Sequence, residues 1–355
     1  MNGNTALVVG LSGIIGRALA EHLATRDGWT VLGMSRHSHD DLGTVQRAEV
    51  DLMDGAATSA AVARLGNPTH LFFVTWARQS TELQNCEVNG VMFRNAVQAA
   101  AAGRLHHVAL VTGLKYYMGS FDNYAAQQLA TPFSEELPRV AGPNFYYTQE
   151  DILFELASQY GFTWSVARPH TIIGYAPGNG MNLSTALAVY ATLCRETGRK
   201  FVFPGSPKQH AGITDMTDAG LLAKHLVWSS TTPAAANTAF NVVNGDVFRW
   251  RKLWQQVADY FGIEVGFYPG KAQPLAESLA DAGPDWDRVV AKHRLRPYKV
   301  EQLAPWWHVD ADLSRTQETL TDMSRSRERG FLEYQRTSAA MIRLFDRLRR
   351  ERIVP

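Results

Sequence analysis

The chain has 355 residues, of which 45% are hydrophobic and 19% charged, and this balance excludes a disordered protein. Its formal net charge of +1 gives no reason to expect a nucleic acid or an acidic membrane as partner. The two cysteines, Cys86 and Cys194, are far apart and show no metal-type spacing. They favour packed thiols in a reducing, cytoplasmic location. The histidines and acids form no group with metal-ligand spacing, so we predict no metal.

The N-terminal residues predict a strand rather than a leader peptide. An apolar run ends at Gly10, with neither a basic leader nor a cleavage site of small residues. Another apolar run, near Leu183–Leu193, is shorter than the roughly 20 residues that a membrane helix needs. We therefore expect a soluble protein.

The first half of the chain alternates short apolar runs with helical patterns, which is typical of a parallel sheet covered on both faces. The predicted helices are Ile15–Thr25, Glu87–Ala101 and Gln149–Tyr160. The predicted strands are Ala6–Val9, Thr30–Met34, His70–Val74, His107–Val111 and Thr163–Ala167. The fold class that follows is α/β, a Rossmann-type doubly wound parallel sheet.

After Arg168-Pro169 the alternation loosens, and a smaller, mostly helical substrate-binding region is expected. We predict helices at Leu183–Arg195, Thr217–Ser229 and Ser338–Glu351 and a strand at Ala239–Val243, with Thr217-Asp218 capping its helix. The predicted dinucleotide-binding domain covers 1–174, with 213–244 returning to it. The remaining segments, 175–212 and 245–355, form the predicted substrate-binding region.

A GxxGxxG motif follows the first strand and opens the first helix. This spacing is the short-chain dehydrogenase variant of the Rossmann fingerprint, in which glycines allow a tight turn, approach of the backbone to a pyrophosphate and close helix packing. The helix N-terminus adds free N–H groups for the phosphates. The predicted cofactor residues here are Gly10, Ser12, Gly13, Ile14, Ile15 and Gly16.

The end of the second strand distinguishes NADPH from NAD. A carboxylate there binds the ribose hydroxyls of NAD, but this chain has Arg36 and His37 instead. Arg36 offers a planar fork to a 2′-phosphate, so NADPH is the predicted cofactor. Asp51-Leu52, after the apparent third strand, matches the place where short-chain dehydrogenases hold the adenine edge.

The usual catalytic pair of that superfamily, a tyrosine and a lysine four residues apart, is missing. Tyr146 is followed at the fourth position by Glu150, and Tyr147 by Asp151. Two segments instead resemble the progesterone 5β-reductase/iridoid synthase-like family, atypical extended short-chain dehydrogenases. They are Thr112-Gly113-Leu114-Lys115-Tyr116-Tyr117-Met118-Gly119 and Asn144-Phe145-Tyr146-Tyr147-Thr148-Gln149-Glu150-Asp151. Further similar motifs, such as Asn85-Cys86-Glu87-Val88-Asn89-Gly90 and Trp306-Trp307, extend the resemblance over nearly the whole chain.

The resemblance implies an NADPH-dependent reductase that acts on the C=C bond of an activated enone or enal. It assigns Lys115 and Tyr146 as the catalytic pair. Hydride addition to the β-carbon places charge on the carbonyl oxygen, which a phenol can hydrogen-bond or protonate, while a nearby ammonium favours phenolate character and holds the ribose. The further positions that it assigns to cofactor contact are Thr75, Ile172, Asn179, Gly180 and Met181.

The expected substrate pocket includes Trp76, His210 and His308. The two histidines depart from the family, which has a tryptophan and an aromatic residue at these positions. They predict a more polar pocket, although either histidine could instead be a satisfied surface residue.

Two other readings stay open. A carbonyl reductase or an epimerase shares the glycine loop, and a non-enzymatic NADP(H)-sensing regulator would keep the fold without turnover. The expected partner is a small enone or enal, with no nucleic acid and no membrane. The oligomeric state stays open, with a homodimer as one alternative.

Overall fold

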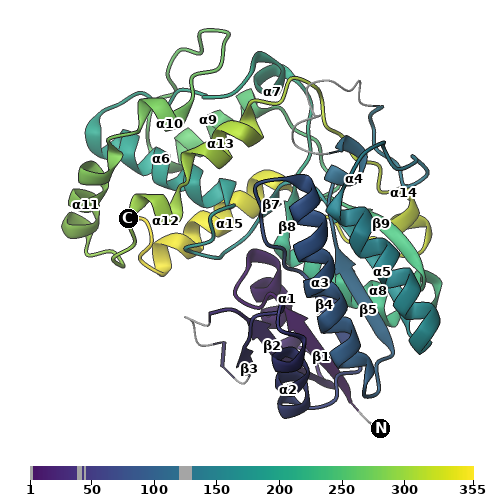
Figure 1. Ribbon diagram of the computed structural model, residues 1–355. Helices are drawn as coiled ribbons and strands as arrows, with labels where there is room; N and C mark the ends of the chain where they lie inside the picture. Colours follow the sequence, from purple (N-terminus) through teal and green to yellow (C-terminus); the bar gives the residue numbers. More distant parts are fainter. Residues whose placement is uncertain (1–2, 38–41, 44, 120–129) are drawn as a thin grey trace. The chain divides into compact units, whose positions relative to one another are not determined.

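The computed structural model describes residues 3–37, 42–43, 45–119 and 130–355 (Figure 1). The chain divides into two compact units. Unit 1 comprises Met1–His170, Ala219–Val242 and Asp322–Glu333, and unit 2 comprises Thr171–Asp218, Val243–Thr321 and Tyr334–Pro355. The return of Asp322–Glu333 to unit 1 was not anticipated, because the sequence assigned all of 245–355 to the substrate-binding region.

The described residues of unit 1 form a sheet of seven parallel strands. Their order across the sheet is β3 (Gln46–Glu49), β2 (Trp29–Ser35), β1 (Asn4–Val9), β4 (His70–Phe73), β5 (His107–Val111), β6 (Thr163–Pro169) and β9 (Thr238–Val242). The strands β1 to β3 extend to one side of the sheet and β4, β5, β6 and β9 extend to the other, so the strand order switches between β1 and β4, as in a Rossmann fold. The α/β prediction is confirmed.

Helices cover both faces of this sheet, which explains why its central strands read as continuous apolar runs. On one face, α2 (Gly55–Leu65), α3 (Glu82–Ala101) and α5 (Phe145–Tyr160) pack against one another, with α3 and α5 side by side (Figure 1). On the other face, α1 (Ile14–Ala24) packs against α8 (Ala219–Thr231). Shorter elements of unit 1 are α4 (Lys115–Met118), η2 (Pro233–Ala235) and α14 (Ser324–Glu328).

One predicted helix start is wrong. Thr217 and Asp218 do not cap a helix but form strand β8 (Thr217–Asp218), which pairs with β7 (Ile172–Ile173). The N–H of Thr217 donates to the carbonyl of Thr171 at 3.0 Å. This pairing with a distant segment outweighs the local capping preference, so the helix begins only at Ala219.

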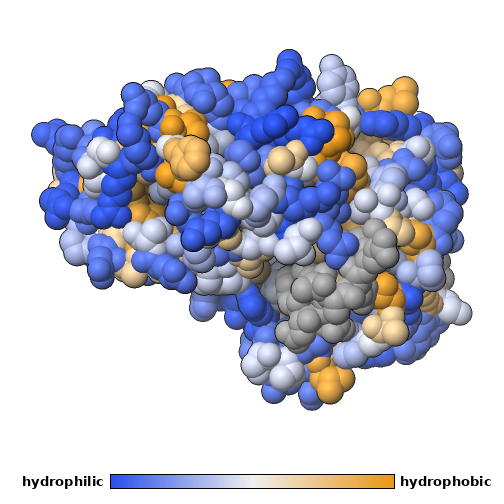
Figure 2. Space-filling view, turned by 90° about the horizontal axis from the view of Figure 1, so that it is seen from above, coloured by the Kyte–Doolittle hydropathy of each residue, from blue (hydrophilic) through white to orange (hydrophobic). Residues whose placement is uncertain are grey.

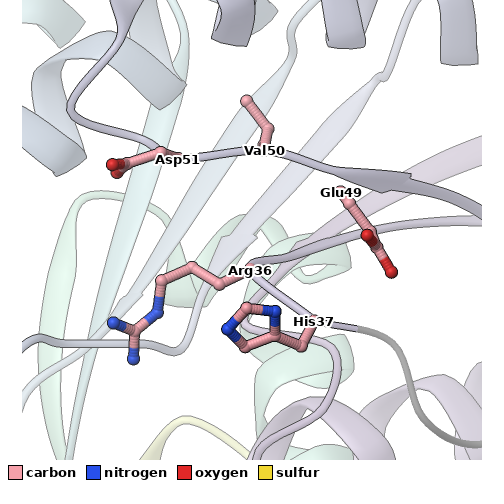
Figure 3. Close-up of a pocket in the computed structure, with 5 residues that line it drawn as sticks. All are labelled: Arg36, His37, Glu49, Val50 and Asp51. Atoms are coloured by element: carbon pink, nitrogen blue, oxygen red, sulfur yellow. The ribbon is translucent and has the colours of Figure 1, made fainter.

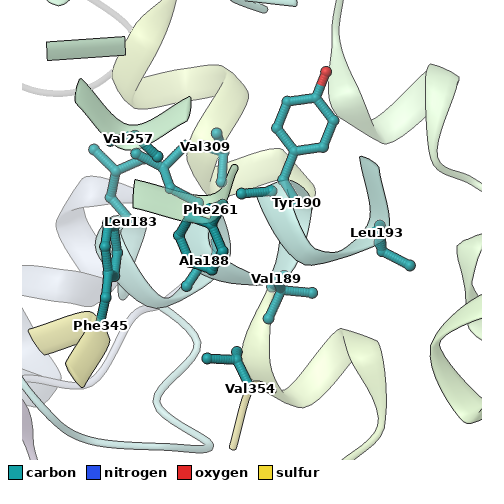
Figure 4. Close-up of a cluster of buried hydrophobic side chains, with 14 of the residues drawn as sticks. Leu183, Ala188, Val189, Tyr190, Leu193, Val257, Phe261, Val309, Phe345 and Val354 are labelled. Atoms are coloured by element: carbon teal, nitrogen blue, oxygen red, sulfur yellow. The ribbon is translucent and has the colours of Figure 1, made fainter. Parts of the chain in front are cut away.

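Unit 2 packs its helices around α6 (Leu183–Thr197), whose residues from Leu183 to Cys194 are all buried (Figure 4). The apolar run that was too short for a membrane helix is therefore the centre of a helical core. The surrounding helices are α9 (Trp250–Phe261), α11 (Ala282–His293), α12 (Val300–Leu303), α13 (Trp306–Leu313) and α15 (Thr337–Arg350). The remaining short helices are α7 (Pro207–Ala211) and α10 (Leu275–Ser278).

Hydrophilic side chains cover most of the face shown in Figure 2, and apolar residues appear there as scattered patches. Exposed large apolar residues occur on several elements, among them Leu83 on α3, Phe154 on α5 and Trp307 on α13. In the described part of the chain, no helix has the length and apolar character needed to span a membrane.

Candidate active site

The glycine motif forms a tight turn between β1 and α1. Gly10 has a φ of +100°, a conformation that favours glycine. A Cβ on Gly16 would lie 2.1 Å from the carbonyl oxygen of Gly10, and a Cβ on Gly10 would lie 2.7 Å from the Cβ of Thr75. The turn therefore requires glycine at both positions and brings the predicted residue Thr75, just after β4, against it.

The start of α1 leaves its first backbone donors available. Gly13 is the N-cap and offers no side-chain acceptor, and the first turn contains no acidic residue. Ser12 is exposed, Ile15 is half-buried and Ile14 is buried. A helix start with this geometry suits an anionic group.

Beside this turn, residues at the ends of β2 and β3 line an open pocket of about 360 Å³ (Figure 3). Arg36 and His37, both exposed, lie next to each other in it. Glu49 also lines this pocket, and Oδ1 of Asp51 accepts the N–H of Met53 at 3.0 Å. Leu52, the next predicted residue, is buried. Two basic side chains, Arg36 and His37, and two acidic ones, Glu49 and Asp51, thus line the pocket near the carboxyl ends of the strands.

Lys115 begins the short helix α4, and its side chain is only 4% exposed. Its Nζ forms an ion pair with Oε2 of Glu82, whose side chain is 8% exposed. The same ammonium lies 4.6 Å from the centre of the Phe145 ring. The predicted catalytic lysine is therefore held from two sides, by a carboxylate of α3 and by an aromatic ring of α5.

Tyr146 is the second residue of α5, and Asn144 connects it to the lysine segment. Oδ1 of Asn144 accepts the N–H of Tyr146 at 3.1 Å, while Nδ2 donates to the carbonyl of Lys115 at 2.9 Å. A Cβ on Gly113 would lie 3.1 Å from the Tyr146 hydroxyl. One asparagine therefore holds both segments of the predicted catalytic pair at the same place.

Trp76 lies at this same helix start. Its ring stacks on Phe145 at a centroid distance of 5.2 Å and an interplanar angle of 14°, and Phe145 in turn packs against the ring of Tyr146 at 4.4 Å. The predicted pocket residue Trp76 thus reaches Tyr146 through one intervening ring.

Glu150 occupies the position, four residues after Tyr146, that a lysine fills in ordinary short-chain dehydrogenases. It is buried, and its carboxylate lies 2.9 Å from a guanidinium nitrogen of Arg168 and 3.2 Å from one of Arg139. Arg168 also packs over the Tyr116 ring, 3.4 Å from its centre. The position that the superfamily uses for catalysis serves here to join α5 to β6.

Tyr147 differs from its neighbour Tyr146. Its ring is buried, and its hydroxyl donates to the carbonyl of Tyr116 and accepts the N–H of Val140 at 3.0 Å. Burial raises the pKa of the Tyr147 phenol. These backbone contacts give Tyr147 a packing role.

Cys86, on α3 one turn beyond Glu82, is half-buried, and burial raises the pKa of its thiol. Its protonated form is therefore favoured, which agrees with a packed thiol.

The other predicted residues belong to unit 2. Ile172 lies in β7, and Oδ1 of Asn179 accepts the N–H of Met181 at 3.0 Å across the exposed Gly180. His210, in α7, stacks on Tyr268 at a ring distance of 4.3 Å, and burial lowers its pKa. His308, in α13, packs edge-on against Trp307 at 5.6 Å. Both histidines are half-buried against aromatic rings.

Glu82 is the functional candidate that sequence reasoning missed. It stands at the first position of α3, after the N-cap Thr81, where acidic residues are common for helix stability alone. The burial and the lysine partner distinguish it, and neither can be read from local sequence.

Comparison with known proteins identifies relatives along the full chain. A model of the PRISE-like Rossmann-fold domain matches residues 41–355. A protein of Nepeta racemosa named (S)-8-oxocitronellyl enol synthase is 39% identical, with 99% of this chain and 93% of that protein covered. A protein of Arabidopsis thaliana named 3-oxo-Delta(4,5)-steroid 5-beta-reductase is 37% identical over the same shares.

Solved structures share the fold at low sequence identity. A UDP-glucose 4-epimerase of Thermotoga maritima matches with a TM-score of 0.68 at 14% identity, covering 98% of this chain and 99% of that one. An epimerase of Methanothermobacter thermautotrophicus matches with a TM-score of 0.72 at 14% identity, covering 98% and 93%. On the domain match and the identity to its relatives, this chain belongs to the progesterone 5β-reductase/iridoid synthase-like family of extended short-chain dehydrogenases.

Proposed function

We propose that this protein is an NADPH-dependent reductase of the activated C=C bond of enones and enals. The observation that carries the proposal is that the Asn144 side chain hydrogen-bonds the backbones of both Lys115 and Tyr146, in a member of a family whose relatives include a named steroid 5β-reductase. Glu150, in its buried pair with Arg168, is unavailable for the ordinary Tyr/Lys arrangement. This favours the enone reductase over a carbonyl reductase or an epimerase.

The residues of unit 1 fit a nicotinamide dinucleotide. The glycine turn and the open start of α1 would hold the pyrophosphate, and Arg36 with His37 would hold a 2′-phosphate. When bound, NADPH supplies the hydride. We also assign Asp51, Leu52 and Thr75 of unit 1 to the cofactor, together with Ile172, Asn179, Gly180 and Met181 of unit 2.

Tyr146 would donate a hydrogen bond to the substrate carbonyl oxygen as negative charge develops on it. The N-terminal end of α5, where Tyr146 stands, adds a partial positive charge. Glu82 offsets the charge of the Lys115 ammonium, so we assign Lys115 to orienting the site and Tyr146 to donating as a neutral phenol. Trp76, His210 and His308 are proposed to contact the substrate.

Arg36→Ala is expected to weaken NADPH binding by about 1.5–3 kcal/mol, the range for a hydrogen bond to a charged group, and to leave NADH binding nearly unchanged. Fluorescence titration of both cofactors measures this difference. Arg104→Ala is the control: Arg104 is exposed and precedes β5, so it lies toward the amino ends of the parallel strands, whereas Arg36 follows the carboxyl end of β2. Equal weakening of the two cofactors by Arg36→Ala would show that Arg36 has a structural role.

Deuterium transfer tests the reaction itself. NADPH that carries deuterium at the transferred C4 position is expected to label the β-carbon of 2-cyclohexenone and to yield cyclohexanone, as read by mass spectrometry and NMR. Deuterium on the carbinol carbon of a surviving alkene would establish a carbonyl reductase instead. Tight NADPH binding with no turnover of any enone would favour the sensing regulator.

A further inference from the structure

Glu82 contacts both parts of the proposed catalytic site with one carboxylate. Its Oε2 pairs with the Lys115 ammonium and accepts Nδ2 of Asn85 at 3.1 Å. Its Oε1 accepts the N–H of Phe145 at 2.9 Å, at the first residue of α5. A single side chain of α3 therefore joins the lysine segment to the helix start that presents Tyr146.

The burial of this pair gives it energetic weight that a surface pair lacks. Both side chains are less than a tenth exposed, so removal of one partner leaves the other charge buried without that partner. Exposed pairs contribute little by comparison. An exposed pair on the same helix α3 offers a comparison, because Arg94 of α3 pairs with Glu155 of α5 at 2.8 Å, where the Glu155 side chain is 55% exposed.

We propose that Glu82 is a positioning residue, which keeps Lys115 charged and fixes the lysine segment relative to Tyr146. The part of this inference that concerns catalysis rests on the proposed function, in which Lys115 and Tyr146 form the catalytic pair. In the described part of unit 1, the other titratable groups nearby are Cys86 on α3 and Tyr146 on α5. Burial raises the pKa of the Cys86 thiol, and Glu82 is the carboxylate that forms an ion pair with Lys115.

The kinetic test compares Glu82→Gln, Glu82→Asp and the control Glu155→Gln with 2-cyclohexenone between pH 6 and 9. Glu82→Gln is expected to lower kcat about 10- to 100-fold, the range for partners that orient a functional group. Its deficit should grow with pH, because a buried ammonium that has lost a neighbouring carboxylate gives up its proton more readily. Glu82→Asp keeps the charge and should recover part of the activity. Glu155→Gln should match the unmodified protein at every pH.

The second test needs no turnover. The double variant Glu82→Gln/Lys115→Met is expected to melt at a higher temperature than Glu82→Gln alone, since it also removes the buried ammonium that has lost its ion pair with Glu82. The melting temperature of Glu82→Gln should also approach that of the unmodified protein as pH rises. Should Glu82→Gln fail to fold, a soluble double variant would support the pair, and failure of both would overturn it.

A pH-independent kinetic deficit together with purely additive melting shifts would overturn the proposal, because Glu82 would then act only as a packing residue. If the unmodified protein reduces no enone, the proposed function fails. The melting experiments still decide whether Glu82 sets the charge of Lys115.

Discussion

Tyr146→Phe is expected to lower the turnover of 2-cyclohexenone about 100-fold or more, with little change in NADPH affinity. Loss of one donor to a developing oxyanion typically has an effect of this order. The ring can keep its packing against Phe145, so the substitution removes only the hydroxyl that faces Gly113. Steady-state kinetics at saturating NADPH should show kcat and kcat/KM falling together, as for an interaction made in the transition state.

Tyr147→Phe is the matched control, one residue along the same helix. Its hydroxyl donates to the backbone carbonyl of Tyr116 and accepts the backbone N–H of Val140, and it also interacts with the side chain of Asn144. The change should lower the melting temperature and leave kcat within a few-fold. A larger kinetic loss for Tyr147→Phe than for Tyr146→Phe would show that Tyr147, and not Tyr146, is the hydrogen-bond donor. A strongly activated enal should show a smaller loss, because its carbonyl needs less assistance.

The sheet could be predicted because each buried parallel strand is a short apolar run with its own boundaries. Predicted and observed limits agree fully at His107–Val111 and within two residues at Thr163–Pro169. The helix starts were less accurate. The sequence predicted helices from Glu87 and Gln149, whereas α3 begins at Glu82 and α5 at Phe145.

The first turns that the sequence prediction left out contain the residues most important to the proposed site. Their N–H groups are capped by side chains of Thr81 and Asn144, and a first turn held in this way need not show apolar periodicity. Glu82 and Tyr146 stand within these turns. Their positions on helices, and the contact of Glu82 with Lys115 across 33 residues, arise from tertiary packing and not from local pattern.

The family resemblance predicted Lys115 and Tyr146 as the catalytic pair, but it did not predict the residues that hold them in place. Sequence alone suggested a lysine that favours phenolate character in the tyrosine. The structure adds a buried carboxylate, that of Glu82, which forms an ion pair with Lys115 and which the sequence alone did not point to. The missing lysine of the ordinary spacing also has a physical explanation, since Glu150 is committed to Arg168.

Acidification is expected to destabilise unit 1 through three buried histidines. Burial lowers the pKa of His70 to about 4 and those of His107 and His225 to about 3. The native state therefore keeps these rings neutral, while the unfolded chain takes up protons below its ordinary histidine pKa of about 6.5. Their contribution to stability is present above pH 6.5 and is lost as pH falls toward 4.

Each of these histidines should remove about 1.4 kcal/mol of unfolding free energy per pH unit in this window, so the three together remove about 4 kcal/mol per unit. Urea unfolding between pH 7.5 and 5 measures the slope. His107→Gln should reduce it by about a third, since the His107 ring bonds to Thr163 and Ser165 at 2.9 Å in a site closed to water. His106→Gln, at the exposed neighbouring position, should leave most of the slope in place. A stability that stays level from pH 6.5 to 5 would mean that these rings are already charged in the native protein.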